Sequence, residues 1–329
     1  MLGRENMELA LICMKQVFSM FLMILAGFVL TRAGIIKMEA KQHFSDLLLY
    51  LVIPCMVLNS YMAEHDASMV KTLFFSYGLS IVMIFVGVLL TDLFTLHMKN
   101  PNRPLVRFSL GYTNAAYFGF PLIQELFGDE GILYASAYVT VFNILLWTHG
   151  QWVLRQKRPG ASDANASAGQ PAASRKGALL SIIKNPVLIS VVIGLIMFSL
   201  NLRLPDIILT PMQMIGNMNT PLAMFVTGMM IAGTSLPSLF RDKLILVTSF
   251  ERLIAIPAVC LVLLCALRLS GMAVQVIFLL EAAPAAAITS VFAIRDHFDE
   301  RFGAGIVVVS TIFSIITLPV CCYLLTRFL

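Results

Sequence analysis

Long apolar stretches recur along the whole chain, and they restrict it to folds that cross a membrane. A helix that spans a bilayer needs about 20 apolar residues. Only 12% of the 329 residues are charged, whereas soluble domains carry about 25%. The sequence therefore predicts an all-α membrane protein with ten transmembrane helices. These predicted spans cover residues 9–31, 44–61, 73–96, 105–127, 132–154, 179–200, 207–232, 244–267, 272–294 and 306–325.

The positive charges are unevenly divided between the two ends of the predicted spans. Most of the 23 Lys and Arg residues lie in the loops after spans one, three, five, seven and nine. The positive-inside rule makes these loops cytoplasmic, so both termini are predicted to be extracytoplasmic. The basic residues form no patch interleaved with aromatic residues, which argues against a nucleic-acid partner.

A long polar connection over residues 155–178 divides the chain into two halves, 1–154 and 179–329. Its small and polar residues predict a flexible cytoplasmic linker. Each half holds five predicted spans, and an odd number forces the second half to insert upside down relative to the first. The sequence therefore predicts two inverted five-helix repeats, as in many secondary transporters.

Two apolar stretches at matching positions of the halves are interrupted by helix-breaking residues. Pro121 removes a backbone donor and Gly119 loosens the chain in span four, and Pro284 follows Glu281 in span nine. Such breaks at membrane depth are tolerated where protein or a water-filled cavity surrounds them. Paired interruptions are the best sequence indication of a transporter's substrate site.

Several segments resemble proteins of the auxin efflux carrier (AEC) family, and the resemblance covers essentially the whole chain. It implies ten helices in two inverted repeats, crossing helices four and nine, an elevator-like movement and a homodimer. It also implies a small organic anion as cargo, because the family includes bacterial permeases for malate and malonate beside plant auxin exporters. The short linker fits a bacterial member in the inner membrane. The segments are 21–28, 32–36, 114–121, 126–131, 141–148, 184–187 and 220–223.

Polar side chains near the two interruptions are the candidate substrate ligands. The amide of Asn114 offers donors and an acceptor to a carboxylate, and half-helix N-termini direct positive dipole ends toward anions. The alternative for Asn114 is a helix-packing amide, and for each proline it is a simple kink. The predicted substrate-binding residues are Asn114, Tyr117, Pro121, Asn143, Glu281, Pro284 and Thr289.

Two charged residues lie inside predicted spans, where an ionisable group suggests function by default. Glu281 precedes Pro284 by three residues and is a candidate for proton coupling, or else a carboxyl hydrogen-bonded between helices. The family pattern has a neutral amide near this position, so Glu281 departs from it. Arg252 in span eight is a candidate contact for the anion or for Glu281, and the alternative is a snorkelling arginine.

The predicted function is secondary active transport of small organic anions across the cell membrane. The sequence contains no enzyme signature and no cofactor motif. The six cysteines form no CxxC pair and no histidine cluster accompanies them, so no metal site is predicted. Two alternatives are a sodium-coupled symporter of the bile-acid type and a membrane sensor that does not transport.

Overall fold

A computed structural model describes residues 2–62, 67–156, 184–200, 202 and 204–328, and all regular elements in these ranges are helical. The predicted linker over 155–178 lies outside the described residues beyond Gln156. Six helical segments are long and apolar enough to cross a membrane, so the chain is a multi-pass membrane protein. These segments are Met14–Arg32, Ala40–Met62, Met69–Thr95, Ala115–Leu154, Lys243–Ala266 and Glu300–Leu325.

The first half contains helices of unequal length, joined in places by short π-helical turns that are labelled η. These elements are α1 (Leu2–Arg32), α2 (Ala40–Leu47), η1 (Leu48–Val52), α3 (Ile53–Met62), α4 (Ala67–Thr95), α5 (Arg103–Gly111), η2 (Ala115–Gly119), α6 (Phe120–Leu145), η3 (Leu146–Gly150) and α7 (Gln151–Leu154).

The second half begins, within the described residues, with two short apolar helices. Its elements are α10 (Pro186–Ser199), α11 (Asp206–Gly216), α12 (Asn219–Ala232), α13 (Leu236–Leu239), α14 (Lys243–Phe250), η4 (Glu251–Ala255), α15 (Ile256–Ala266), α16 (Met272–Glu281), α17 (Ile288–Arg295) and α18 (Glu300–Phe328).

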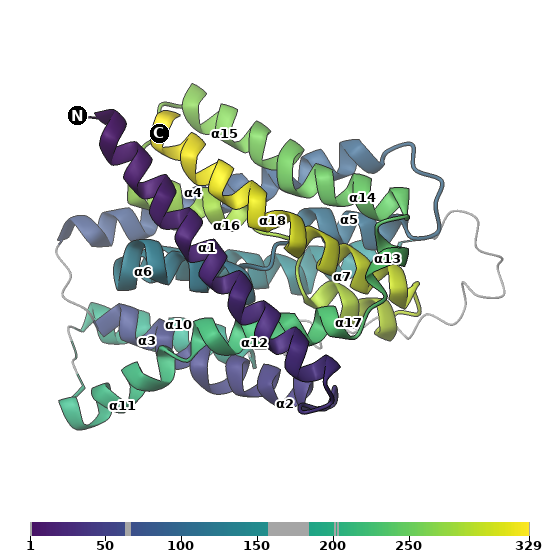
Figure 1. Ribbon diagram of the computed structural model, residues 1–329. Helices are drawn as coiled ribbons and strands as arrows, with labels where there is room; N and C mark the ends of the chain where they lie inside the picture. The colour runs from purple at the N-terminus through teal and green to yellow at the C-terminus, as the bar shows by residue number, and fades with distance from the viewer. Residues whose placement is uncertain (1, 63–66, 157–183, 201, 203, 329) are drawn as a thin grey trace.

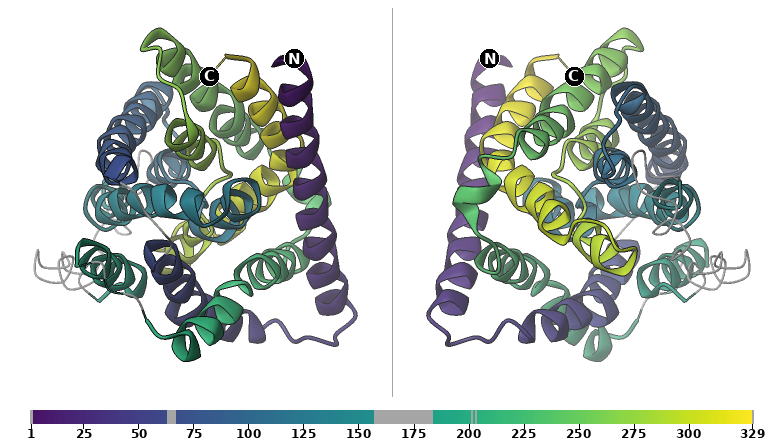
Figure 2. Two further views of the ribbon diagram at one scale, coloured as in Figure 1. Left: turned by 90° about the vertical axis from the view of Figure 1, so that its left-hand side faces the viewer. Right: turned by 90° about the vertical axis from the view of Figure 1, so that its right-hand side faces the viewer.

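The helices form two groups that meet around α6. Helices α2, α3, α10, α11 and α12 lie together on one side, and α4, α14, α15, α16 and α18 lie on the other (Figures 1 and 2). Helix α1 runs along the edge and packs against both α12 and α18. It begins where α18 ends, and the loops after α1, α4 and α12 lie at the opposite end (Figure 1).

The predicted boundary between spans 105–127 and 132–154 coincides with a sharp bend at Gly128, where φ 61° and ψ −152° depart from helical values. Glycine adopts this left-handed conformation without the steric cost that a side chain imposes. The predicted span 207–232 consists of α11 and α12, with Asn217 and Met218 between them.

Prolines inside the spans are accommodated by π-helical turns. The turns η1, η2 and η4 each end two residues before a proline, namely Pro54, Pro121 and Pro257. A proline ring clashes with the carbonyl four residues earlier in a regular α-helix. The wider turn, closed by a bond between residues i and i+5, relieves this clash without ending the helix. These three prolines therefore kink their spans, but the helix continues through each of them.

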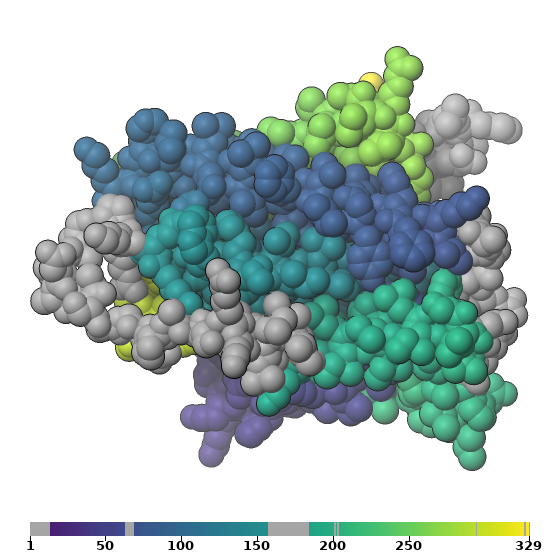
Figure 3. Space-filling model, turned by 180° about the vertical axis from the view of Figure 1, so that it is seen from behind, coloured from purple at the N-terminus to yellow at the C-terminus, as the bar shows by residue number. Residues whose placement is uncertain are grey.

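The outer faces are apolar, as expected for contact with lipid. Helix α4 lies across the upper part of one face, above the segments of α6 and α10 (Figure 3). Its Phe74, Phe85, Leu89 and Leu93 side chains are exposed. Lipid tails are as apolar as these side chains, so helix association depends on close packing. Glycines at helix contacts are therefore expected to matter more than apolar residues on this surface.

The contact between α1 and α12 gives a test of that expectation. A Cβ atom at Gly228 would lie 2.1 Å from the carbonyl oxygen of Ile24 and 2.7 Å from the backbone nitrogen of Phe28. Gly228→Ala is therefore expected to force the two backbones apart and lower the thermal unfolding midpoint of the purified protein in detergent. Gly78→Ala is the matched control, since a Cβ there meets nothing within 4 Å. Equal midpoints for both variants would contradict this packing.

Candidate functional site

Two helix interruptions pair with each other in the middle of the protein. Helix α5 ends at Gly111 and η2 begins at Ala115, while α16 ends at Glu281 and α17 begins at Ile288. The Asn114 N–H donates to the carbonyl of Pro284 at 2.7 Å, and the Ala286 N–H donates to the carbonyl of Tyr112 at 3.0 Å. The segments form an antiparallel bridge, so these main-chain groups are satisfied without a ligand.

The carbonyl groups at the ends of both broken helices converge on Arg252 of η4. Its guanidinium donates to the carbonyl of Leu110 at 2.6 Å, to that of Ala283 at 3.2 Å, and also to that of Glu281. The last carbonyls of a helix have no intrahelical donor and carry its negative dipole end. Arg252, which is 0% exposed, thus joins the C-terminal ends of α5 and α16 and is not a snorkelling residue.

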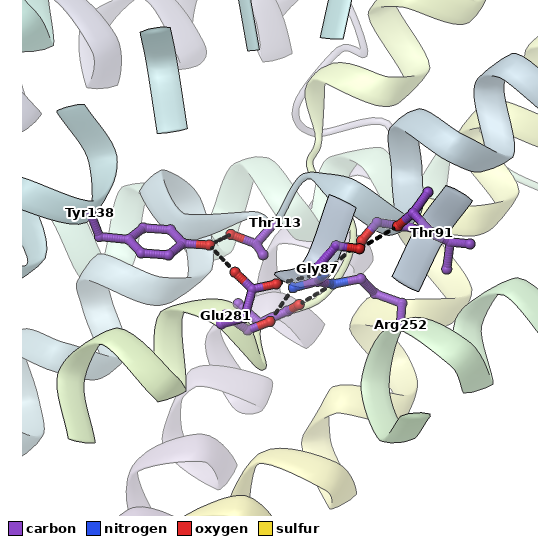
Figure 4. A network of polar contacts seen from close by, with 8 residues as sticks. Gly87, Thr91, Thr113, Tyr138, Arg252 and Glu281 are labelled. Atoms are coloured by element: carbon purple, nitrogen blue, oxygen red, sulfur yellow. Dashed lines mark hydrogen bonds and ion pairs between the residues drawn. The ribbon is translucent and has the colours of Figure 1, made fainter. Parts of the chain in front are cut away.

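The side chain of Glu281 completes this network (Figure 4). It is 1% exposed; Oε1 lies 3.2 Å from Nη1 of Arg252, and Oε2 accepts a hydrogen bond from the Tyr138 hydroxyl at 2.7 Å. That hydroxyl also lies 3.5 Å from Oγ1 of Thr113, within the first interruption. The carboxylate is therefore engaged by one charge and one neutral donor, and Tyr138 links it to the first interruption.

A glycine on α4 makes room for the carboxylate. A Cβ atom at Gly87 would lie 2.8 Å from Oε1 of Glu281, closer than real Cβ contacts allow. The next turn of α4 places Thr91, whose hydroxyl donates to the Gly87 carbonyl at 2.9 Å (Figure 4). The ion pair is thus enclosed by α4, α6, η4 and α16, and a side chain at position 87 would have to displace the carboxylate.

The predicted residues of the first interruption lie on or just after it. Asn114 is 4% exposed, and its amide does not cap the helix that follows. Tyr117 is partly buried and lies near Ser45 and Asp46 of α2. The expectation that Pro121 breaks the helix is wrong. The interruption covers Tyr112 to Asn114, and Pro121 lies in the first turn of α6, where π-turn η2 accommodates its missing N–H.

The remaining predicted residues have different surroundings. Pro284 lies in the interruption between α16 and α17. Thr289 is buried in the first turn of α17, and its hydroxyl has no hydrogen-bond partner among the described residues. Asn143 donates to the carbonyl of Val139 and accepts from the amide of Asn185, which caps the N-terminus of α10. Asn143 therefore makes helix-packing contacts.

Helix α16 leads from an open cleft to the paired interruptions. The cleft has a volume of about 480 Å³, and its lining includes Lys71 of α4, Glu130 of α6 and Gly271 at the start of α16. The ten residues of α16 rise about 15 Å at 1.5 Å per residue. Glu281 at the other end of α16 is therefore remote from this cleft.

Sequence reasoning missed Tyr138, Thr113 and Ser310 as parts of the network. Ser310 of α18 accepts the N–H of Ala285 at 3.1 Å, so a third helix supports the second interruption. A tyrosine inside an apolar span needs a partner for its hydroxyl when it is buried. Tyr138 in span five needs such a partner, and Glu281 lies at a similar depth in span nine. Their matching depth could have indicated this contact from the sequence.

Two comparisons with known proteins agree with this architecture. The sequence profile of the family described as "Membrane transport protein" matches residues 12–322. The chain is also 21% identical over 320 residues to "Uncharacterized transporter MJ1031" of Methanocaldococcus jannaschii, covering 94% of this chain and 97% of that protein. The chain therefore belongs to the Membrane transport protein family, the auxin efflux carrier family that its sequence resembles, and is a membrane transporter and not an enzyme.

Proposed function

We propose that this protein is a secondary active carrier of small organic anions, with ten spans arranged as two inverted five-helix repeats. One observation supports this most directly: the two interruptions hydrogen-bond to each other in a chain of the transporter family. The helices that resume after them, η2 and α17, begin beside this junction. Their N-termini would present positive dipole ends to an anion.

The charges favour Asn114 over Arg252 as the ligand for the anion. Arg252 is enclosed and already donates to three carbonyls and to the carboxylate of Glu281. An anion that displaced Glu281 would leave a buried carboxylate without a partner, which is costly. Asn114 precedes η2 directly and brings an amide that can donate to a carboxylate without a competing charge.

The proposed movement is elevator-like. The network around Arg252 ties α4, α5, α6, η4 and α16 together, which supports a transport domain of α4–α7 and α14–α18 that moves as one body. Helices α1–α3 and α10–α12 then form the scaffold, and α1 is its long edge helix (Figure 2). The predicted homodimer, the inner membrane and the extracytoplasmic termini belong to the same proposal.

Counterflow in liposomes that contain the purified protein tests this function. We expect that malate, malonate, lactate or indole-3-acetate loaded inside will drive accumulation of the same labelled compound, with and without sodium. Accumulation that needs sodium would favour the bile-acid type of symporter. Binding without counterflow would favour a sensor, and no response to any carboxylate would contradict the proposal.

Asn114→Ala should lower the rate of counterflow by tenfold or more, which corresponds to about 1.4 kcal/mol of lost interaction with the anion. The amide does not cap η2, so we expect little change in thermal stability. Gln42→Ala is a suitable control, because Gln42 is an amide on α2 whose side chain makes an exposed hydrogen bond with Asp46. Wild-type rates for Asn114→Ala would exclude the residue from the binding site.

A further inference from the structure

Two buried amide side chains lie near the junction of α11 and α12. Asn219, the first residue of α12, is 2% exposed, and neither its Oδ1 nor its Nδ2 has a hydrogen-bond partner among the described residues. The Oδ1 of Asn59 on α3 is also buried without a partner. A Cβ atom at Gly216 would lie 3.2 Å from Nδ2 of Asn59. Because Gly216 precedes Asn219 by three residues, the two amides belong to the same junction.

Such groups are normally satisfied by protein or water. A buried donor or acceptor without a partner carries the full cost of its desolvation, and each exception in a native protein needs an explanation. An asparagine amide offers a carbonyl acceptor and two N–H donors, and only another polar group can satisfy them. The amides of Asn219 and Asn59 therefore call for a polar group that the described residues do not supply.

Asn219 lies on the face of α12 that is opposite its contact with α1. Gly228 and Phe225 of α12 contact α1 through their backbones. At about 100° per residue, Asn219 lies on the opposite face of α12. The helical neighbours of α12 besides α1 include η1, α6 and η2, and η2 begins directly after Asn114.

We propose that Asn219 and Asn59 form a second polar subsite of the carrier, which binds a hydroxyl group on the carboxylate cargo. This inference rests on the proposed function. The buried atoms without a partner are two amide oxygens and one amide nitrogen. A hydroxyl both donates and accepts, so it can serve an oxygen and the nitrogen, whereas a carboxylate only accepts and leaves both oxygens unfilled. Exchanging the oxygen and nitrogen of the Asn219 amide keeps one donor and one acceptor there, so a hydroxyl still fits.

Paired competition assays separate the hydroxyl from the rest of the cargo. Counterflow of labelled malate or lactate is measured in proteoliposomes in the presence of unlabelled inhibitors. Lactate is compared with propionate, and malate with succinate, because the members of each pair differ by one hydroxyl group. The hydroxylated member of each pair is expected to compete at least tenfold better. In Asn219→Leu and Asn59→Leu, this ratio should fall toward one because the hydroxyl loses its partners, while inhibition by propionate and succinate persists.

Thr317→Val is the matched control, because it removes a hydroxyl on α18 that also lacks a partner among the described residues. It should keep the wild-type ratio. The leucine variants should unfold at or above the wild-type temperature, since they replace unsatisfied polar groups. A monodisperse sample in detergent confirms that they fold.

A wild-type protein that responds to carboxylates without preferring the hydroxylated members overturns the subsite alone. The same holds for a preference that survives both leucine variants. A wild-type protein that responds to no carboxylate overturns the proposed function.

Discussion

Arg252→Met is expected to abolish transport and to lower the free energy of unfolding by about 3–5 kcal/mol, the cost of breaking a buried ion pair from one side. The variant leaves the carboxylate of Glu281 enclosed without its cation and removes the donor for the carbonyls of Leu110, Glu281 and Ala283. The two broken helices then lose the group that joins them. Thermal and denaturant unfolding in detergent measure the stability, and counterflow measures the transport.

Two further variants separate charge from positioning. Arg252→Lys keeps the positive charge but lacks the planar fork that reaches several acceptors at once, so stability should recover more than transport does. In Arg252→Met/Glu281→Leu, the buried charge is gone, and the double variant should be more stable than Arg252→Met. If the destabilisation by Arg252→Met and that by Glu281→Leu simply add in the double variant, the two side chains are not coupled, and the ion pair does not account for the loss in Arg252→Met.

Much of the fold could be predicted because lipid imposes strong rules on the sequence. Apolar stretches of bilayer length predicted ten spans, and six helical segments of the described residues are long and apolar enough to cross a membrane. Prolines in apolar surroundings marked stretches that deviate from regular helix. Pro284 does lie between two helices, as its sequence context suggested. Pro121 did not follow that expectation, because a proline in a span has two outcomes. A break leaves backbone groups that need partners elsewhere, whereas a π-turn keeps the helix intact.

The partners of the candidate residues could not be predicted, because they come from distant parts of the chain. Arg252 and Glu281 were candidates for an ion pair, but the additional contacts to the ends of α5 and α16 depend on how these helices meet. Asn143 was also a predicted substrate ligand, yet its amide contacts Asn185, which caps α10. Local sequence indicates that a buried polar group needs a partner, and the tertiary fold decides which one.

Glu281→Gln is expected to change the pH dependence of transport while the protein still folds. Glutamine has nearly the same shape and can still accept from Tyr138 or Arg252, so the network around the two interruptions is largely kept. It cannot bind and release a proton. If the Glu281 carboxyl carries a proton in each cycle, uptake by the wild type rises with an inward proton gradient, and uptake by the variant does not. Initial rates in proteoliposomes, measured over a range of pH on each side of the membrane, give this comparison.

The neighbouring acid provides the control for this experiment. Glu251 lies beside Arg252 in η4 and is partly buried, so Glu251→Gln removes an ionisable group from the same region and should leave the pH profile unchanged. Tyr138→Phe removes the hydroxyl that donates to Oε2 of Glu281 and should shift the profile without flattening it, because the carboxyl is still present. A Glu281→Gln profile that overlays the wild type would exclude Glu281 from proton coupling. Its role would then be confined to holding Arg252 between the ends of α5 and α16.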